Sequence, residues 1–170
     1  MSSSQRIPVE PNSLYVTTSA LAADGRFHWS VIHVDEYGRC TKHHWMAVSS
    51  DSAGREAYIR RSLAYGALNA TPNQAVLAYF KISEYRPIQS ADLEATCATI
   101  FPYSYQTAAQ NRAYGISCRT WTISLLSRLF SPERASQIEM MVIRHSTAYS
   151  NQFATAFLHG RPYTTAVVAI

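Results

Sequence analysis

One stretch of the chain, residues 27–48, restricts the fold more than any other because it has the pattern of a β-hairpin. Residues 27–34 are rich in aromatic and β-branched side chains, which favour strands. Asp35-Glu36-Tyr37-Gly38 is typical of a turn, and residues 40–48 continue as the second strand. The pattern predicts an antiparallel sheet with helices packed on it, which is an α+β fold.

Segments outside the hairpin supply further strands and the helices. The strand-like segments are residues 14–18, 75–85 and 162–169, the last as an edge strand. Asp24-Gly25 is a turn signal before the hairpin. Helices are expected at residues 53–65, 91–101, 118–130 and 132–149. Residues 102–115 have no clear period, so we expect an ordered loop there.

The N-terminal residues differ from the rest of the chain. Pro8 and Pro11 are spaced against regular structure, so residues 1–13 are expected to form a flexible arm. Residues 14–170 then form a single α+β domain. The full length of 170 residues with 47% hydrophobic residues is enough for one domain with a substantial core.

The distribution of charge bears on the possible partners. The net charge is +4, from 15 Lys and Arg against 11 Asp and Glu, and the basic residues form no run longer than Arg60–Arg61. Nucleic-acid-binding proteins usually concentrate basic residues in a patch or stripe. The charge distribution therefore disfavours a nucleic acid as the partner. The expected partner is a small-molecule or peptide-like substrate.

The cysteines bear on the cellular compartment. Cys40, Cys97 and Cys118 are odd in number and far apart, which disfavours a disulfide framework and a Cys-x-x-Cys zinc site. Reduced thiols indicate a cytoplasmic protein. No signal-peptide pattern precedes them, and no stretch approaches the ~20 apolar residues of a membrane anchor, so no anchor is expected.

Three histidines of the hairpin are candidates for chemistry. Strand side chains alternate, so His28 and Ser30 share one face. A four-residue turn pairs Ser30 with His43, whereas a five-residue turn pairs it with His44. Either register places one of these two histidines diagonally across from His28, ~7–8 Å away or a little less. A zinc site on them lacks a third ligand, so we expect neither a metal nor a cofactor.

Cys118 is the candidate nucleophile. It begins a predicted helix, where the positive end of the helix dipole and free N–H groups favour a thiolate. A nearby histidine would complete a nucleophile–base pair, and the N–H groups could bind an oxyanion. The alternative is that Cys118 and His28 are core residues, because a cysteine on an apolar helix face more often packs than reacts.

These motifs resemble those of the circularly permuted papain-like thiol fold. Phe27-His28-Trp29-Ser30 gives a His-Trp strand, His43-His44 lies on the next strand, and Ser117-Cys118-Arg119-Thr120-Trp121 opens a helix. The same order is found in the NlpC/P60-related lecithin:retinol acyltransferase-like and PPPDE families. The chain also resembles small fungal proteins with a His-Trp strand and a Cys-x-x-Trp helix. The family's usual Asn-Cys is Ser-Cys here.

The resemblance implies a papain-like domain in which Cys118 faces His28. Cys118 would attack an amide or ester, and His28 would act as base and then acid. His43 or His44 would orient or polarise His28, or assist at the oxyanion. The alcohol or amine would leave as an acyl-cysteine intermediate forms, and the acyl group would then pass to water or to an amine, as in a hydrolase or acyltransferase. Two alternatives remain: a small-molecule enzyme that uses only histidine acid–base chemistry, for cyclisation or isomerisation, and a non-catalytic binding module.

Overall fold

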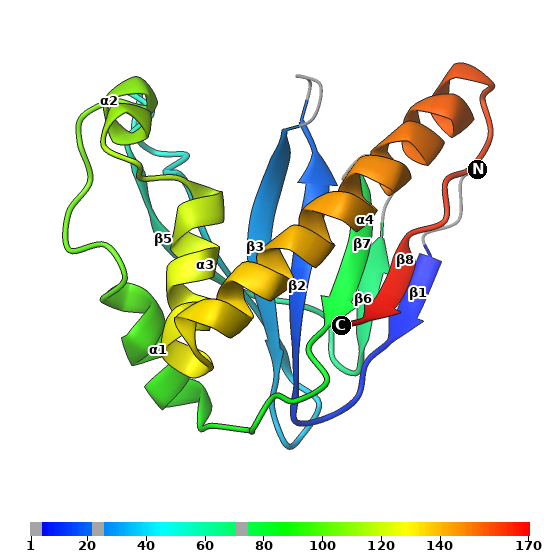
Figure 1. Ribbon diagram of the computed structural model, residues 1–170, viewed down its shortest axis with the longest axis horizontal. Helices are drawn as coiled ribbons and strands as arrows, with labels where there is room; N and C mark the ends of the chain where they lie inside the picture. The colour runs from blue at the N-terminus through cyan, green and yellow to red at the C-terminus, as the bar shows by residue number, and fades with distance from the viewer. Residues whose placement is uncertain (1–4, 22–25, 71–74) are drawn as a thin grey trace.

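The computed structural model describes residues 5–21, 26–70 and 75–170, and a six-stranded mixed sheet forms its centre (Figure 1). The strand order is β5-β4-β3-β2-β7-β8. Neighbouring strands are antiparallel except β7 and β8, which are parallel. The bounds are β2 Ser13–Ala20, β3 Phe27–Val34, β4 Cys40–Ala47, β5 Glu56–Ser62, β7 Val76–Lys81 and β8 Ala166–Ala169.

Helices cover one face of this sheet. They are α1 Ser90–Ala98, α2 Ala108–Ala113, α3 Cys118–Leu129 and α4 Pro132–Leu158. Ser117 and Ser131 cap α3 and α4 through their side chains, as short polar residues do at helix starts. The larger core cluster lies under these helices and contains Trp29 and Val31 of β3 with Trp121 and Leu125 of α3.

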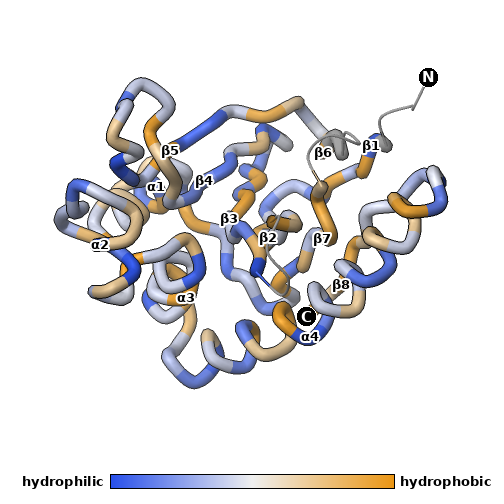
Figure 2. The backbone as a smooth tube through the Cα atoms, turned by 90° about the horizontal axis from the view of Figure 1, so that it is seen from above, coloured by the Kyte–Doolittle hydropathy of each residue, from blue (hydrophilic) through white to orange (hydrophobic). Residues whose placement is uncertain are grey.

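A small two-stranded sheet packs on the opposite face. It consists of β1 (Gln5–Pro8) paired antiparallel with β6 (Ala67–Ala70). Ile7 and Leu68 from these strands join a second core cluster with Ile32 of β3. In the view from above, α3 and α4 lie on one side of the six-stranded sheet and β1 and β6 on the other (Figure 2).

The α+β class is confirmed, but the expected helix at residues 53–65 is wrong. That segment contains β5, the edge strand beside β4, with Tyr58 opposite Trp45 and Ile59 opposite His44. Apolar residues in this segment fit a helical period as well as a strand period. Pairing with β4 favours the strand, because in this position Glu56 is buried and Tyr58 is partly buried against the helices.

Smaller corrections concern the ends of the chain and one loop. The sheet is mixed and not purely antiparallel, because the expected C-terminal edge strand runs parallel to β7. The expected loop at residues 102–115 contains α2, and α4 continues past residue 149 to Leu158. The Asp24-Gly25 turn lies outside the described residues.

The expected flexible arm is also partly wrong, because β1 occupies its middle. Residues 1–4 are outside the described part of the chain, but Ile7 is only 4% exposed. Among the residues that the structure describes, no helix combines the length and apolar character that crossing a membrane requires.

Ile7→Ala should therefore destabilise the domain. Removing a buried isoleucine side chain typically costs about 2–4 kcal/mol of unfolding free energy, through lost burial and the cavity left behind. Arg6→Ala is the matched control, since Arg6 is exposed on the same strand and should change stability by less than about 0.5 kcal/mol. Urea denaturation followed by tryptophan fluorescence measures both, and equal effects would mean that β1 adds nothing to the core.

Candidate functional site

The ladder between β3 and β4 ends halfway along both strands. Their paired residues run from Val34 with Cys40 to Val31 with His43. Beyond this point β3 stays paired with β2 as far as Phe27, and β4 stays paired with β5 as far as Ala47. Residues 27–30 of β3 and 44–47 of β4 are therefore not paired with each other, although they lie in the middle of the sheet. We call these segments the unpaired ends of β3 and β4.

A histidine pair bridges these unpaired ends. Nε2 of His28 lies 2.9 Å from Nδ1 of His44, with the ring centroids 5.2 Å apart. Since Val34 pairs with Cys40, the turn has the five-residue register, which places Ser30 across from His44 and His28 on its diagonal. The prediction that one histidine of the His43-His44 pair lies beside His28 is confirmed, and that residue is His44.

Burial holds both imidazoles in the neutral form. Burial, together with a smaller effect of the Lys42 charge, lowers the pKa of His28 to about 4 and that of His44 to about 3. His44 is only 3% exposed, and its Nε2 is buried without any hydrogen-bond partner. An unpartnered buried nitrogen of this kind costs free energy unless a ligand or water satisfies it.

His43 lies on the other face of β4, in the core under the helices. Its Nδ1 is 2.7 Å from the hydroxyl of Tyr58, and the two rings are stacked. Tyr58 in turn stacks on Trp121 of α3. His43 is 2% exposed, and burial lowers its pKa to about 4, so it packs β4 and β5 against α3.

Cys118 contacts the backbone of β3. Its Sγ accepts a hydrogen bond from the Trp29 N–H at 3.5 Å, and its S–H points to the carbonyl oxygen of Phe27 at 3.9 Å. Both backbone groups lie on the edge of β3 that faces β4, where the ladder has ended. The thiol therefore satisfies strand groups that β4 no longer reaches.

The structure thus gives Cys118 and His28 different partners. Trp29 and Val31 point toward α3, so alternation directs His28 to the opposite face. No hydrogen bond joins Sγ to either imidazole in the described part of the chain. Burial raises the pKa of the Cys118 thiol, although the Trp29 N–H and the Arg112 charge oppose this. Cys40 and Cys97 are also free thiols, both buried.

Sequence reasoning missed a buried carboxylate near the thiol. Glu56 is 6% exposed and accepts hydrogen bonds from Asn111 at 2.9 Å, from Trp45 at 3.3 Å and from Arg112 at 2.5 Å. These contacts fasten α2 to β5. No sequence signal indicated these contacts, because Glu56 lay in an expected helix and Arg112 in an expected loop.

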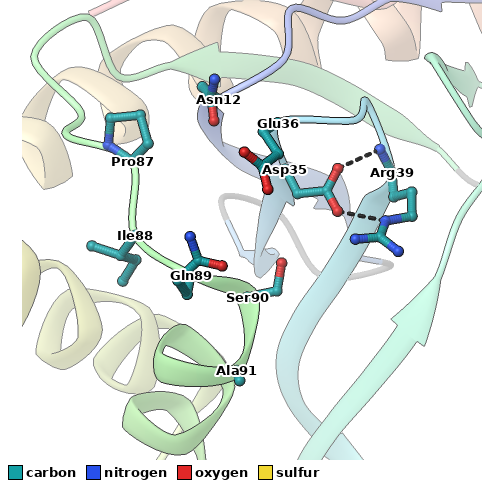
Figure 3. A pocket seen from close by; sticks show the side chains of 9 residues that line it. All are labelled: Asn12, Asp35, Glu36, Arg39, Pro87, Ile88, Gln89, Ser90 and Ala91. Atoms are coloured by element: carbon teal, nitrogen blue, oxygen red, sulfur yellow. Dashed lines mark hydrogen bonds and ion pairs between the residues drawn. The ribbon is translucent and has the colours of Figure 1, made fainter.

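Two surface pockets lie at the paired end of β3 and β4, away from the histidine pair. One of about 260 Å³ is lined by the turn after β3 and the start of α1 (Figure 3). Asp35 and Arg39 of this pocket form an ion pair, with Nε of Arg39 2.6 Å from the carboxylate. The second, about 450 Å³, shares Asp35 and Arg39 and also reaches Cys40.

Within residues 5–21, 26–70 and 75–170, no group of three or more His, Cys, Asp or Glu side chains could hold a metal ion. Comparison of the chain with protein-family models, curated proteins and solved structures finds no match. The chemistry of the histidine pair and the thiol therefore carries the functional argument.

Stability should fall as the pH drops from about 6.5 to 4. The unfolded chain takes up protons on these histidines below pH ~6.5, whereas the folded chain holds His28 and His43 neutral down to about 4 and His44 to about 3. Each group should therefore add about 1 kcal/mol per pH unit to the slope. Urea titrations between pH 5 and 7 measure how the unfolding free energy depends on pH. This dependence should be weaker in His44→Gln than in wild type. It should be the same as in wild type in His159→Gln, because His159 is exposed. Parallel slopes would contradict the buried neutral pair.

Replacing the thiol should separate its structural role from chemistry. Cys118→Ala leaves the Trp29 N–H and Phe27 carbonyl without a partner and should cost about 1–3 kcal/mol. Cys118→Ser retains a donor and acceptor and should cost less. Thermal denaturation compares the two with Cys97→Ala, a cavity control, and equal losses for Ala and Ser at position 118 would exclude the backbone contacts as the cause.

Proposed function

We propose that the chain is an enzyme that uses the His28–His44 pair for acid–base chemistry on a small-molecule substrate. The observation that carries this proposal is the 2.9 Å contact between the two imidazoles, together with the buried and unpartnered Nε2 of His44. A pair that is neutral at pH 7 has one ring nitrogen free to act as a proton acceptor. The resulting activity belongs to the histidine-based class that the sequence left open.

The shared hydrogen bond permits two arrangements of the protons. When Nε2–H of His28 donates to Nδ1 of His44, Nδ1 of His28 is a free base and His44 carries a proton on Nε2. When Nδ1–H of His44 donates instead, His28 is protonated on Nδ1 and Nε2 of His44 is the free base. Proton uptake at one outer nitrogen can thus accompany release at the other.

The two histidines have complementary exposure. His28 is only partly buried, so it is the residue that meets the substrate, whereas His44 is almost fully buried. Cys118 supports this arrangement from the helix side by holding the unpaired end of β3. In this role Cys118 is a positioning residue and not a nucleophile.

The activated neutral ester 4-nitrophenyl acetate provides a test. Its hydrolysis should be catalysed with a rate that rises through pH about 4 and then stays level to pH 8, since His28 is already neutral. His28→Ala should lower the rate by at least about 100-fold, as loss of a general base does. His159→Gln controls for surface imidazoles and should not lower the rate. Cys118→Ser, which keeps a donor and an acceptor at position 118, should retain most of the rate. A wild-type rate equal to that of His28→Ala would overturn the proposal.

A thiol hydrolase or acyltransferase of the permuted papain-like kind is the second candidate. The observation that favours it is the set of groups around Sγ that would stabilise a thiolate: the N–H of Trp29, the N–H of Arg119 and the charge of Arg112. The thiolate would attack the carbonyl, the alcohol or amine would leave, and water or an amine would release the acyl group.

The same experiment separates the two candidates. An acyl-cysteine mechanism requires the rate to disappear in Cys118→Ser and to rise above pH 8, because burial raises the pKa of the thiol. It also requires Cys118 to react with iodoacetamide faster than Cys40 or Cys97 in the folded protein, and more slowly in His28→Ala. Histidine chemistry requires none of these effects.

A further inference from the structure

Two cations lie directly opposite each other beside the histidine pair. Lys42 of β4 is the register partner of Arg61 of β5. Side chains at directly opposite positions share a face, and like charges placed this way are destabilising. Lys42 is partly buried, and burial lowers the pKa of its ammonium group. The charge of Arg61 lowers the pKa of Lys42 further.

Neither cation has an acidic partner in the part of the chain that the structure describes. Its seven ion pairs involve other residues. Arg60, next to Arg61 in sequence, makes the contrast clear: it points to the helix face and pairs with Glu94 of α1. The charges of Lys42 and Arg61 are left uncompensated.

The same face carries His44. Lys42 and His44 are two residues apart on β4, so their side chains project to the same side. Besides burial, Lys42 and Arg61 both lower the pKa of His44. His44, whose Nε2 is buried without a hydrogen-bond partner, thus shares its face of the sheet with both cations.

We propose that Lys42 and Arg61 bind the anionic group of the substrate, a carboxylate or a phosphate on a small molecule, next to Nε2 of His44. A guanidinium and an ammonium side by side suit the oxygens of such a group. The anion removes the repulsion between the two cations and gives His44 an acceptor for its Nε2–H. This deepens the histidine-based function and rests on it for turnover, whereas binding itself requires no catalysis.

Binding can be measured without a known substrate. The probes are inorganic phosphate and glutarate, and the readout is the imidazole NMR signals of His28 and His44 over pH 3–7. Either anion should shift these signals saturably and raise the pKa of His44, because a nearby negative charge favours imidazolium. The anion that binds more tightly identifies the chemical class.

Three variants make the binding test specific. Lys42→Met and Arg61→Gln should each weaken the anion by at least about tenfold, and Arg61 is exposed, so its replacement should not affect folding. Arg55→Gln is the matched control, since it also replaces one arginine by glutamine. Arg55 lies outside the strands and pairs with Asp51. No saturable shift with either anion, or equal affinity in Arg61→Gln and Arg55→Gln, would overturn the proposal.

A pair of esters separates this inference from the proposed function. Wild type should hydrolyse the mono-4-nitrophenyl ester of glutaric acid with at least tenfold higher kcat/KM than 4-nitrophenyl acetate. Arg61→Gln should remove most of this preference for the anionic ester, whereas His28→Ala should lower both rates. Equal kcat/KM for the two esters would refute the anion site alone. If neither ester is hydrolysed while anions still bind through Lys42 and Arg61, the acid–base function fails and the anion site stands.

Discussion

The early end of the β3–β4 ladder is the constraint on which the rest of the site depends. Paired strands satisfy each other's backbone groups, so separation after Val31 and His43 leaves polar groups of β3 without partners. Side chains on both faces of the sheet bridge this gap. On the helix face the Cys118 thiol takes the place of β4, and on the other face the His28–His44 bond spans the two strands.

Burial then decides the chemical state of the groups gathered there. The cost of burying a charge keeps the imidazoles neutral and the thiol protonated, so the resting site carries no ionised nucleophile. Positive charge remains at Lys42 and Arg61, which have no acidic partner in the described part of the chain. The proposed function follows from this arrangement: a neutral histidine pair next to uncompensated cations would suit an anionic substrate, which would supply the missing charge.

Much of this arrangement follows from local sequence patterns. Strand alternation placed His28 beside one of the two adjacent histidines, and the helices at Cys118 and Pro132 begin where the sequence predicted them. Alternation could also have placed Lys42 beside His44. Arg61 could not be found in the same way, because residues 53–65 fit a helical period and only pairing with β4 makes them a strand.

The sequence by itself determined the α+β class, the hairpin, the histidine pair and the position of Cys118 at a helix start, since each depends on residues close together in the chain. Tertiary structure alone decided the length of the β3–β4 ladder, the parallel addition of β8, the packing of β1, and the face of the sheet on which each candidate residue lies. The physical reason is that these outcomes depend on competition between distant segments for backbone hydrogen bonds and apolar cover. A thiol and an imidazole with suitable local patterns can therefore lie on opposite sides of one strand.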